Sequence, residues 1–166
     1  MSNLIMSWSE CSIELGKTGA GDAMATTLKT VGVIADKSTT LASEDGEVLE
    51  AKATGGKIVA REAAEGKITL TTKIKEPEYE FLSTLIGATV NAAKDELTIK
   101  SLIVSGDYSV KLTPKNIGGT GLKIRKANIS YKDGFSEEEG MFGELVITVL
   151  ACADGELYTK YKKKTV

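Results

Sequence analysis

Histidine is absent from this chain of 166 residues. It is the commonest general base and metal ligand, and the one ordinary side chain that titrates near neutral pH. Without it, an enzyme would have to rely on carboxylates, lysine or cysteine. Aromatic residues make up only 5% of the chain, which leaves few surfaces on which bases or sugars could stack. We therefore expect no enzymatic activity, no bound cofactor and no metal site.

Cysteine is scarce as well, and the two thiols lie far apart in the sequence. Cys11 and Cys152 belong to no CxxC or CxxH pair, and two cysteines do not form a disulfide framework in a chain of this length. We expect both to be reduced thiols of the core. The formal net charge is −2, so no overall electric field attracts the chain to nucleic acid.

Long apolar runs are also missing. No stretch approaches the roughly 18 apolar residues of a membrane-spanning helix. The N-terminal MSNLIMSWSE has neither a basic region nor a long apolar segment, so we expect no signal peptide, a cytoplasmic origin and no membrane insertion. Length and uniform composition favour one domain over residues 1–166, with extended arms at residues 1–10 and 155–166.

What the sequence does contain is a repeated alternation of apolar and polar side chains, which is the pattern of β-strands. The clearest case is 67–74, where Ile68 and Leu70 lie on the face opposite Lys67 and Thr69. Further strands are predicted at 11–16, 29–34, 47–53, 57–64, 97–104, 108–114, 121–131 and 144–153.

Short glycine-containing connections predict how some of these strands pair. Residues 57–64 and 67–74 are separated by Glu65-Gly66, and we expect them to form a hairpin that turns at Gly66. A second hairpin is predicted between 97–104 and 108–114, closed by the Ser-Gly-Asp sequence that separates them.

Three features distinguish the second half of the chain. The apolar phase of 121–131 changes near Lys126, which indicates a β-bulge. The acidic segment 132–140 is expected to be a loop. Residues 144–153 are apolar at nearly every position, which predicts that this strand is buried on both faces.

One segment, 77–87, has the spacing of a helix, with apolar side chains three and four residues apart. Pro77 suits the first turn, and Gly87 is a natural stop. We predict a mainly β fold: a single-domain β-sandwich or barrel with one flanking α-helix, at about residues 78–86, that covers an open end.

The glycine-rich stretches do not complete a ligand-binding motif. Gly16-Lys17-Thr18 ends like a Walker A loop, but Cys11 stands where the first glycine belongs and no helix is predicted to follow. Gly19-Ala20-Gly21 lacks the third glycine of a dinucleotide fingerprint. Asp45-Gly46-Glu47 is only a fragment of a calcium loop, so we interpret it, like Glu137–Glu139, as a solvated acidic segment.

Four segments, in their order along the chain, resemble parts of phage tail tube proteins. The first resembles the opening strand and turn, the second the paired glycine before a long hairpin, the third the single helix, and the fourth the last apolar strand with its Asp-Gly turn. They are VGVIADKSTTLASEDGE (31–47), ATGGKIVAREAAEGKITLTTKI (53–74), PEYEFLSTLIG (77–87) and GELVITVLACADGE (143–156).

Membership of this family would imply a β-sandwich or barrel with one helix, which assembles with copies of itself into rings, usually hexameric. The rings stack into a hollow tube through which DNA or an effector passes. The tubes of contractile injection systems, including type VI secretion and phage-tail-like bacteriocins, are similar in fold. The resemblance also implies tape-measure, tail-terminator, baseplate or sheath proteins as partners, and a place in a virion tail or tail-like particle assembled in the bacterial cytoplasm.

Three surfaces are expected to make contacts between subunits. The loop 43–56 would join successive rings and would be mobile in a free subunit. A polar hairpin face would line the lumen or meet a neighbour, and a basic C-terminal arm would be solvated or meet an acidic loop of a neighbouring copy. The residues are Glu44, Asp45, Glu47 and Glu50 for the loop; Lys57, Arg61, Lys67, Thr69, Thr71 and Lys73 for the hairpin face; and Lys160, Lys162, Lys163 and Lys164 for the arm.

A second hypothesis is a monomeric β-sandwich module that binds a glycan or a protein partner. The two differ in self-association, because a tube subunit forms larger species as its concentration rises whereas a monomeric module does not.

Overall fold

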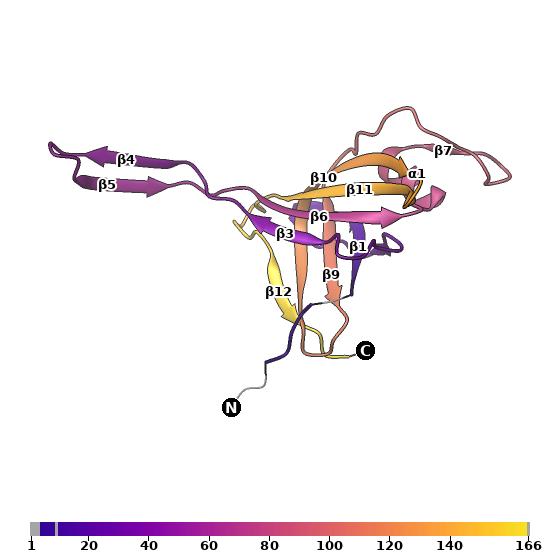
Figure 1. Ribbon diagram of the computed structural model, residues 1–166, viewed down its shortest axis with the longest axis horizontal. Helices are drawn as coiled ribbons and strands as arrows, with labels where there is room; N and C mark the ends of the chain where they lie inside the picture. The colour runs from indigo at the N-terminus through magenta and orange to yellow at the C-terminus, as the bar shows by residue number, and fades with distance from the viewer. Residues whose placement is uncertain (1–3, 9, 166) are drawn as a thin grey trace.

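A single long strand, β10 (Thr120–Ser136), belongs to both halves of the β-sheet in the computed structural model (Figure 1). The structure describes residues 4–8 and 10–165. The strand order is β2-β1-β9-β10-β11-β6-β3, with β12 paired to β10, and all pairs of neighbouring strands are antiparallel. The mainly β fold with one helix is therefore confirmed.

The bend in β10 divides the sheet into two halves that cross over a shared core (Figure 1). The first half of β10 lies with β1 (Cys11–Lys17), β2 (Lys29–Thr30), β9 (Tyr108–Pro114) and β12 (Thr159–Lys162). The second half lies with β3 (Thr40–Ser43), β6 (Ile68–Lys75) and β11 (Gly140–Val149).

The core is a single cluster of aliphatic side chains from both halves of the sheet. Ile13 and Val110 come from one half, and Leu70, Leu145 and Ile147 from the other; all are fully buried. Alternate residues of each strand supply these side chains, as the period of a strand requires. The alternation of apolar and polar residues in the sequence therefore determines which side chains form the core.

The predicted bulge is confirmed at the bend of β10. Ile124 pairs with Val110 and Ala127 pairs with Tyr108, so Arg125 and Lys126 together face a single residue of β9. Two residues opposite one define a β-bulge, which bends the strand and changes the side of the sheet on which its side chains lie.

The strand β6 has the two faces that its sequence predicted. Ile68, Leu70, Thr72 and Ile74 are buried, whereas the residues between them are partly or fully exposed. The prediction for β11 was wrong in one respect, because its alternation of burial leaves Val146 and Thr148 only partly covered. This strand is central in the sheet but buried on one face only.

The prediction that the hairpin turns at Gly66 was wrong. Strand β5 (Ile58–Ala63) pairs with β4 (Val48–Lys52) and not with β6, and the turn lies at residues 53–57, where Gly55 and Gly56 have positive φ. Both of the possible hairpins carry glycine between two alternating segments, so the local pattern did not distinguish them.

The strands β7 (Thr89–Val90) and β8 (Leu97–Thr98) form a short hairpin of their own. The expected pairing of 97–104 with β9 is therefore wrong, because β9 lies between β1 and β10. The segment expected to be an acidic loop is mostly strand, since β10 and β11 stay paired as far as Ser136 and Gly140. The strand expected at 29–34 is limited to β2.

The helix α1 (Tyr79–Ile86) confirms the predicted helical segment. Gly87 ends it in the left-handed conformation, and Leu82, Leu85 and Ile86 are buried against the sheet. A single 3-10 turn, η1 (Ala20–Asp22), interrupts the long connection between β1 and β2.

The described parts of both chain ends lie together beside the turn between β9 and β10 (Figure 1). Asn116 donates a side-chain hydrogen bond to the carbonyl of Met6, and the amide of Thr120 donates to Ser7. The C-terminal segment is only partly a free arm, because β12 pairs with the start of β10. Both cysteines are free thiols as expected, and Cys152 is buried, which raises the pKa of its thiol. The expectation that Cys11 lies in the core was wrong, because it is partly exposed on β1.

Leucine-to-alanine substitutions should destabilise the protein much more in the core than on the surface. Leu145 is fully buried, so Leu145→Ala should lower the free energy of unfolding by about 2–5 kcal/mol. Leu49 on β4 is 64% exposed, and Leu49→Ala should change it by less than about 0.5 kcal/mol. Urea unfolding of both variants measures the difference, and equal effects would contradict this description of the core.

Candidate assembly interface

The most prominent surface feature is a two-stranded hairpin that extends away from the sandwich (Figure 1). We call residues 47–64, which contain β4 and β5, the projecting arm. Every residue of both strands is exposed, and the two strands pair only with each other. Their outer edges therefore present unpaired N–H and C=O groups, which is the arrangement that accepts another strand.

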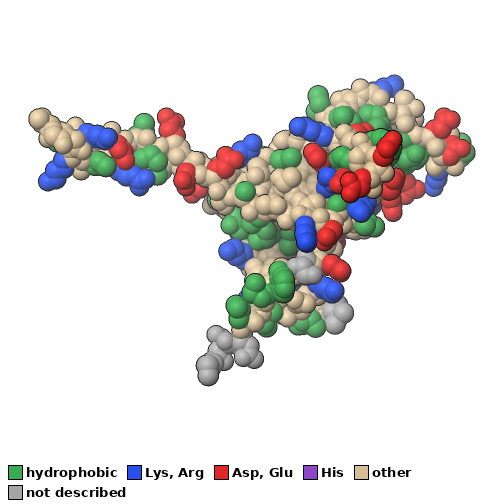
Figure 2. All heavy atoms as spheres, in the orientation of Figure 1, with side chains coloured by type: hydrophobic (Ala, Val, Ile, Leu, Met, Phe, Trp, Pro, Cys, Tyr) green, Lys and Arg blue, Asp and Glu red, His purple; other side chains and the backbone are tan. Residues whose placement is uncertain are grey.

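Apolar side chains lie along the projecting arm. Val48 and Leu49 on β4, and Ile58 and Val59 on β5, are between 38% and 64% exposed. Figure 2 shows hydrophobic side chains beside lysine and arginine side chains on the arm. An isolated two-stranded hairpin is at best marginally stable in water, so this one exposes apolar surface that its own subunit does not cover.

The arm joins the sandwich through a narrow neck in which two chain segments, 44–46 and 65–67, touch. A Cβ atom at Gly46 would lie 1.8 Å from the carbonyl oxygen of Ala64, and one at Gly66 would lie 1.7 Å from that of Glu44. Only glycine permits so close an approach of two backbones. Backbone hydrogen bonds of 2.8 Å from Glu44 to Lys67 and from Ala64 to Glu47 hold the two segments together.

The acidic residues expected to join successive rings are divided between the neck and the arm. Glu44 and Asp45 lie in the neck, Glu47 begins the arm, and Glu50 in β4 forms an ion pair with Arg61 at 3.5 Å. The segment 43–56 thus contains the strand predicted at 47–53 and a tight turn, and the expected mobility of this segment in a free subunit stays a prediction.

The six residues of the expected hairpin face do not form one surface. Lys57 and Arg61 lie on the arm, whereas the other four belong to β6 and the residue before it. These four are Lys67, Thr69, Thr71 and Lys73. The division follows from the pairing of β5 with β4 rather than with β6.

The outer face of β6 continues across its neighbours as a sheet of small polar side chains. Thr69 pairs with Thr148, Thr71 with Val146, and Lys73 with Glu144. Glu144 is also the register partner of Lys132 on its other side, so it lies between two lysines across neighbouring strands. Lys73 forms an ion pair with Glu139 at 3.0 Å and lies over the ring of Phe142. Lys73 therefore has a local counter-charge.

The basic residues of the C-terminal segment lie along the edge of the other half of the sheet. Lys160 and Lys162 are in β12, opposite Leu122 and Thr120 of β10. Lys163 continues the pairing and donates its ammonium hydrogen bond to the carbonyl of Lys115 at 2.9 Å, and Lys164 follows it.

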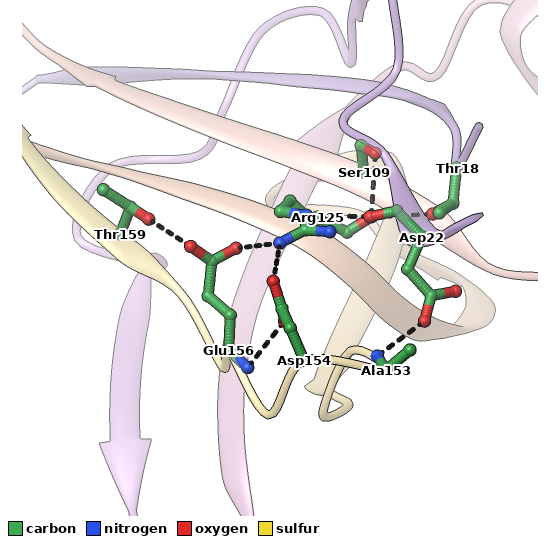
Figure 3. A network of polar contacts seen from close by, with 8 residues as sticks. All are labelled: Thr18, Asp22, Ser109, Arg125, Ala153, Asp154, Glu156 and Thr159. Carbon is green, nitrogen blue, oxygen red and sulfur yellow. Dashed lines mark hydrogen bonds and ion pairs between the residues drawn. The ribbon is translucent and has the colours of Figure 1, made fainter. Parts of the chain in front are cut away.

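A network around Arg125 holds the bulge of β10 in place (Figure 3). Its guanidinium contacts Asp154 at 2.9 Å and Glu156 at 3.0 Å, and its Nε donates to the carbonyl of Asp22 at 2.8 Å. These carboxylates raise the pKa of Arg125, which in turn lowers the pKa of Asp154. The network is structural, because it connects segments rather than opening onto a cavity.

Sequence reasoning did not identify the Arg125 network. The partners of Arg125 lie 29 to 103 positions away in the chain, where no local pattern connects them. The one sequence feature that pointed to this network was the position of Arg125, where the alternation of apolar residues in the strand changes phase.

A groove of about 450 Å³ lies between α1 and the β1–β2 region. Apolar side chains, including Phe81, Leu85 and Tyr108, line its floor, and Lys17 and Glu80 are among the charged residues that also line it. A monomeric binding module would use a groove of this kind.

Within the described residues, no group of three or more histidine, cysteine, aspartate or glutamate side chains is placed to hold a metal ion. In residues 4–8 and 10–165, no helix has the length and apolar character needed to cross a bilayer.

No model of a known protein family matches the sequence. No curated protein matches it significantly.

Substituting a neck glycine should loosen the base of the arm. Gly66→Ala places a methyl group against the backbone of Glu44, and the resulting strain of about 1–3 kcal/mol should speed exchange of the Glu44 and Ala64 amides about tenfold or more. Gly19→Ala is the matched control, because its Cβ would lie no closer than 3.4 Å to its neighbours. Hydrogen exchange measured by NMR tests this, and unchanged protection in Gly66→Ala would refute the tight neck.

Acidification should weaken the ion pair of Asp154. The hydrogen bond from Arg125 lowers the pKa of Asp154 in the folded state. The ion pair therefore contributes its full stabilisation to the folded protein above the pKa of an unfolded aspartate, about 3.9, and loses it as the pH falls through the lower pKa of the folded state. Asp154 is 61% exposed, so the effect is small. Urea unfolding from about pH 6 to about pH 3 should show a weaker acid dependence in Asp154→Asn than in the unmodified protein. The same dependence in both would count against this ion pair.

Proposed function

We propose that this chain is a structural subunit that assembles with copies of itself into stacked rings, which form the hollow tail tube of a phage or a phage-tail-like particle. The observation that carries the proposal is the projecting arm, a hairpin with exposed apolar side chains and two unpaired edges. Its position after the edge strand β3, and the single helix that follows β6, support the same assignment.

Burial of the arm against neighbouring subunits would supply energy for assembly. Fully burying one valine, leucine or isoleucine side chain stabilises a complex by about 1.5–3 kcal/mol. The arm exposes four such side chains: Val48, Leu49, Ile58 and Val59. Every copy both inserts an arm and receives one, so this contribution repeats along the assembly.

The shape of the subunit favours rings and tubes over closed dimers. The arm extends from one end of the β3–β6 sheet, and the opposite end carries α1 and the β10–β11 turn (Figure 1). A surface at one end that meets a different surface on the next copy is a heterologous contact, which produces rings or filaments.

The polar outer face of the sheet is the best candidate for the wall of the lumen. Threonines of β6 and β11 share it with lysines, and Glu139 and Glu144 supply carboxylates beside Lys73. Where lysine and glutamate charges offset each other, a polar wall would let DNA or an effector pass without binding it tightly. DNA is therefore cargo in this proposal, and sheath, tape-measure, terminator and baseplate proteins are the partners that a tail would supply.

Electron microscopy of concentrated protein tests the proposal. The unmodified chain should form rings or tubes, and the double variant Leu49→Asp/Val59→Asp should stay monomeric, because aspartate on the arm cannot be buried without a large desolvation cost. Ile103→Asp, at a residue that is 77% exposed away from the arm, is the control and should still assemble.

Light scattering, which measures molecular mass, identifies the result that would contradict the proposal when it is repeated over a range of protein concentrations. A mass that stays monomeric at every concentration and salt level, together with the absence of rings and tubes, would overturn the proposal and favour the monomeric binding module.

A further inference from the structure

Two lysines face each other across neighbouring strands on the outer side of the β9–β10–β12 sheet. Lys111 of β9 and Lys123 of β10 are direct partners in the pairing register. Like charges at such positions repel, so this pair is unfavourable within the subunit alone. Both ammonium groups lie over the ring of Tyr161 on β12, at 5.7 Å and 5.0 Å from its centroid. We call these three residues the basic patch.

The aromatic base of the basic patch is firmly held. The ring of Tyr161 lies against Gly121, where an added Cβ would come within 2.5 Å of it. The phenol oxygen lies 3.0 Å from both the hydroxyl of Thr113 and the carbonyl of Leu112. A fixed ring beneath two cations keeps them in place, so little freedom is lost when an anion binds.

Within the part of the chain that the structure describes, no ion pair neutralises the basic patch, and one carboxylate, Glu14 of β1, lies opposite Lys111 in the pairing register. Neither Lys111 nor Lys123 forms an ion pair with a described carboxylate, and at this end only Lys115 does, with Glu10 at 3.6 Å. Lys160 and Lys162 alternate with Tyr161 along the same edge strand, so they add positive charge on the opposite face of the sheet, and Lys163 and Lys164 follow them. The surface therefore fits an anionic partner.

An anionic turn of matching character lies at the other end of β10. The acidic turn, Glu137–Glu139, connects β10 to β11, and among the described residues Glu137 and Glu138 form no ion pair. Phe135 and Met141, partners across the hairpin just before the turn, are 67% and 44% exposed. Figure 2 shows acidic side chains gathered at this end of the molecule. The turn thus combines two carboxylates with uncovered apolar surface on a paired hairpin.

The basic patch and the acidic turn cannot meet within one subunit. Lys123 lies near the start of β10, whereas the turn follows its last residue, Ser136, and the strand bends between them (Figure 1). Two complementary surfaces at opposite ends of one strand can join only between copies. Because each copy carries both, a contact in which the patch of one copy receives the turn of the next leaves one patch and one turn free, so it is heterologous and can repeat.

We propose that the basic patch is a socket that receives the acidic turn of a second copy of this chain. The inference rests on the proposed function, since it identifies a second contact by which the subunits assemble. Glu137 and Glu138 of one copy lie against Lys111 and Lys123 of the next, and Phe135 packs at the edge of the contact. In the assembly, the arm would bury apolar surface, and this contact would determine how neighbouring copies are oriented and aligned.

Charge reversal tests the socket. Lys111→Glu/Lys123→Glu and Glu137→Lys/Glu138→Lys should each raise the concentration needed for assembly about tenfold or more, because each places like charges together. The quadruple variant restores opposite charges with reversed signs and should assemble. An equimolar mixture of the two double variants should do the same, in alternating order.

Two further measurements make the result specific. Lys37→Glu/Lys100→Glu has the same change in net charge on exposed residues away from the basic patch, and should assemble like the unmodified protein. A carbodiimide, which joins amines directly to carboxylates, should link Lys111 or Lys123 to Glu137 or Glu138 between copies. Thermal unfolding of each variant at low concentration verifies that the subunit is folded.

The possible failures are distinguishable. If the unmodified chain does not assemble at all, both the proposed function and the socket are refuted. If it forms tubes and both double variants form them equally well, the socket is wrong and the proposed function stands. Loss of assembly in the double variants with no rescue in the quadruple variant or the mixture would also overturn the socket, because the basic patch would then contact an anion other than the acidic turn.

Discussion

The bulge in β10 is the constraint on which the rest of the structure depends. At Arg125 the strand leaves one half of the sheet and enters the other, and its ladder of hydrogen bonds is interrupted there. The carbonyl of Arg125 accepts instead from Thr18 at 2.8 Å and from Ser109 at 2.9 Å, while its guanidinium holds Asp154 and Glu156 (Figure 3). Because buried backbone groups require partners, these bonds make the bend possible, and the bend lets the two halves enclose one core.

The molecule divides into a part that is stable alone and a part that is not. The sandwich buries a continuous aliphatic cluster, whereas the projecting arm contributes no side chain to it. The neck at Gly46 and Gly66 fixes where the arm leaves the sheet without covering its sides. Beyond the neck, the two strands of the arm expose Leu49 and Val59, so in the proposed assembly contacts with neighbouring subunits would supply most of the arm's stabilisation.

The sequence predicted the structure correctly wherever the spacing of apolar residues within one segment was enough to define it. The faces of β6, the helix at 79–86 and the bulge near Lys126 each follow from spacing within about ten residues. Strand partners were less predictable, because Gly66 can mark either a turn or a close approach of two backbones, and residues 53–72 contain both uses of glycine. The Arg125 network and the basic patch join residues from separate strands, and only the fold brings such residues together.

Charge and shape together give the subunit a direction. Like ends repel each other, since a basic patch facing a second basic patch, or an acidic turn facing a second acidic turn, places unpaired charges of one sign in contact. Pairing across a two-fold axis through either end is thereby disfavoured, and the arm, which has no symmetrical counterpart on its own surface, disfavours it again. In the assembly proposed above, the head-to-tail arrangement satisfies both features, because every copy offers the same pair of unlike surfaces to its neighbours. A bent strand with opposite charges at its two ends would make such an assembly polar.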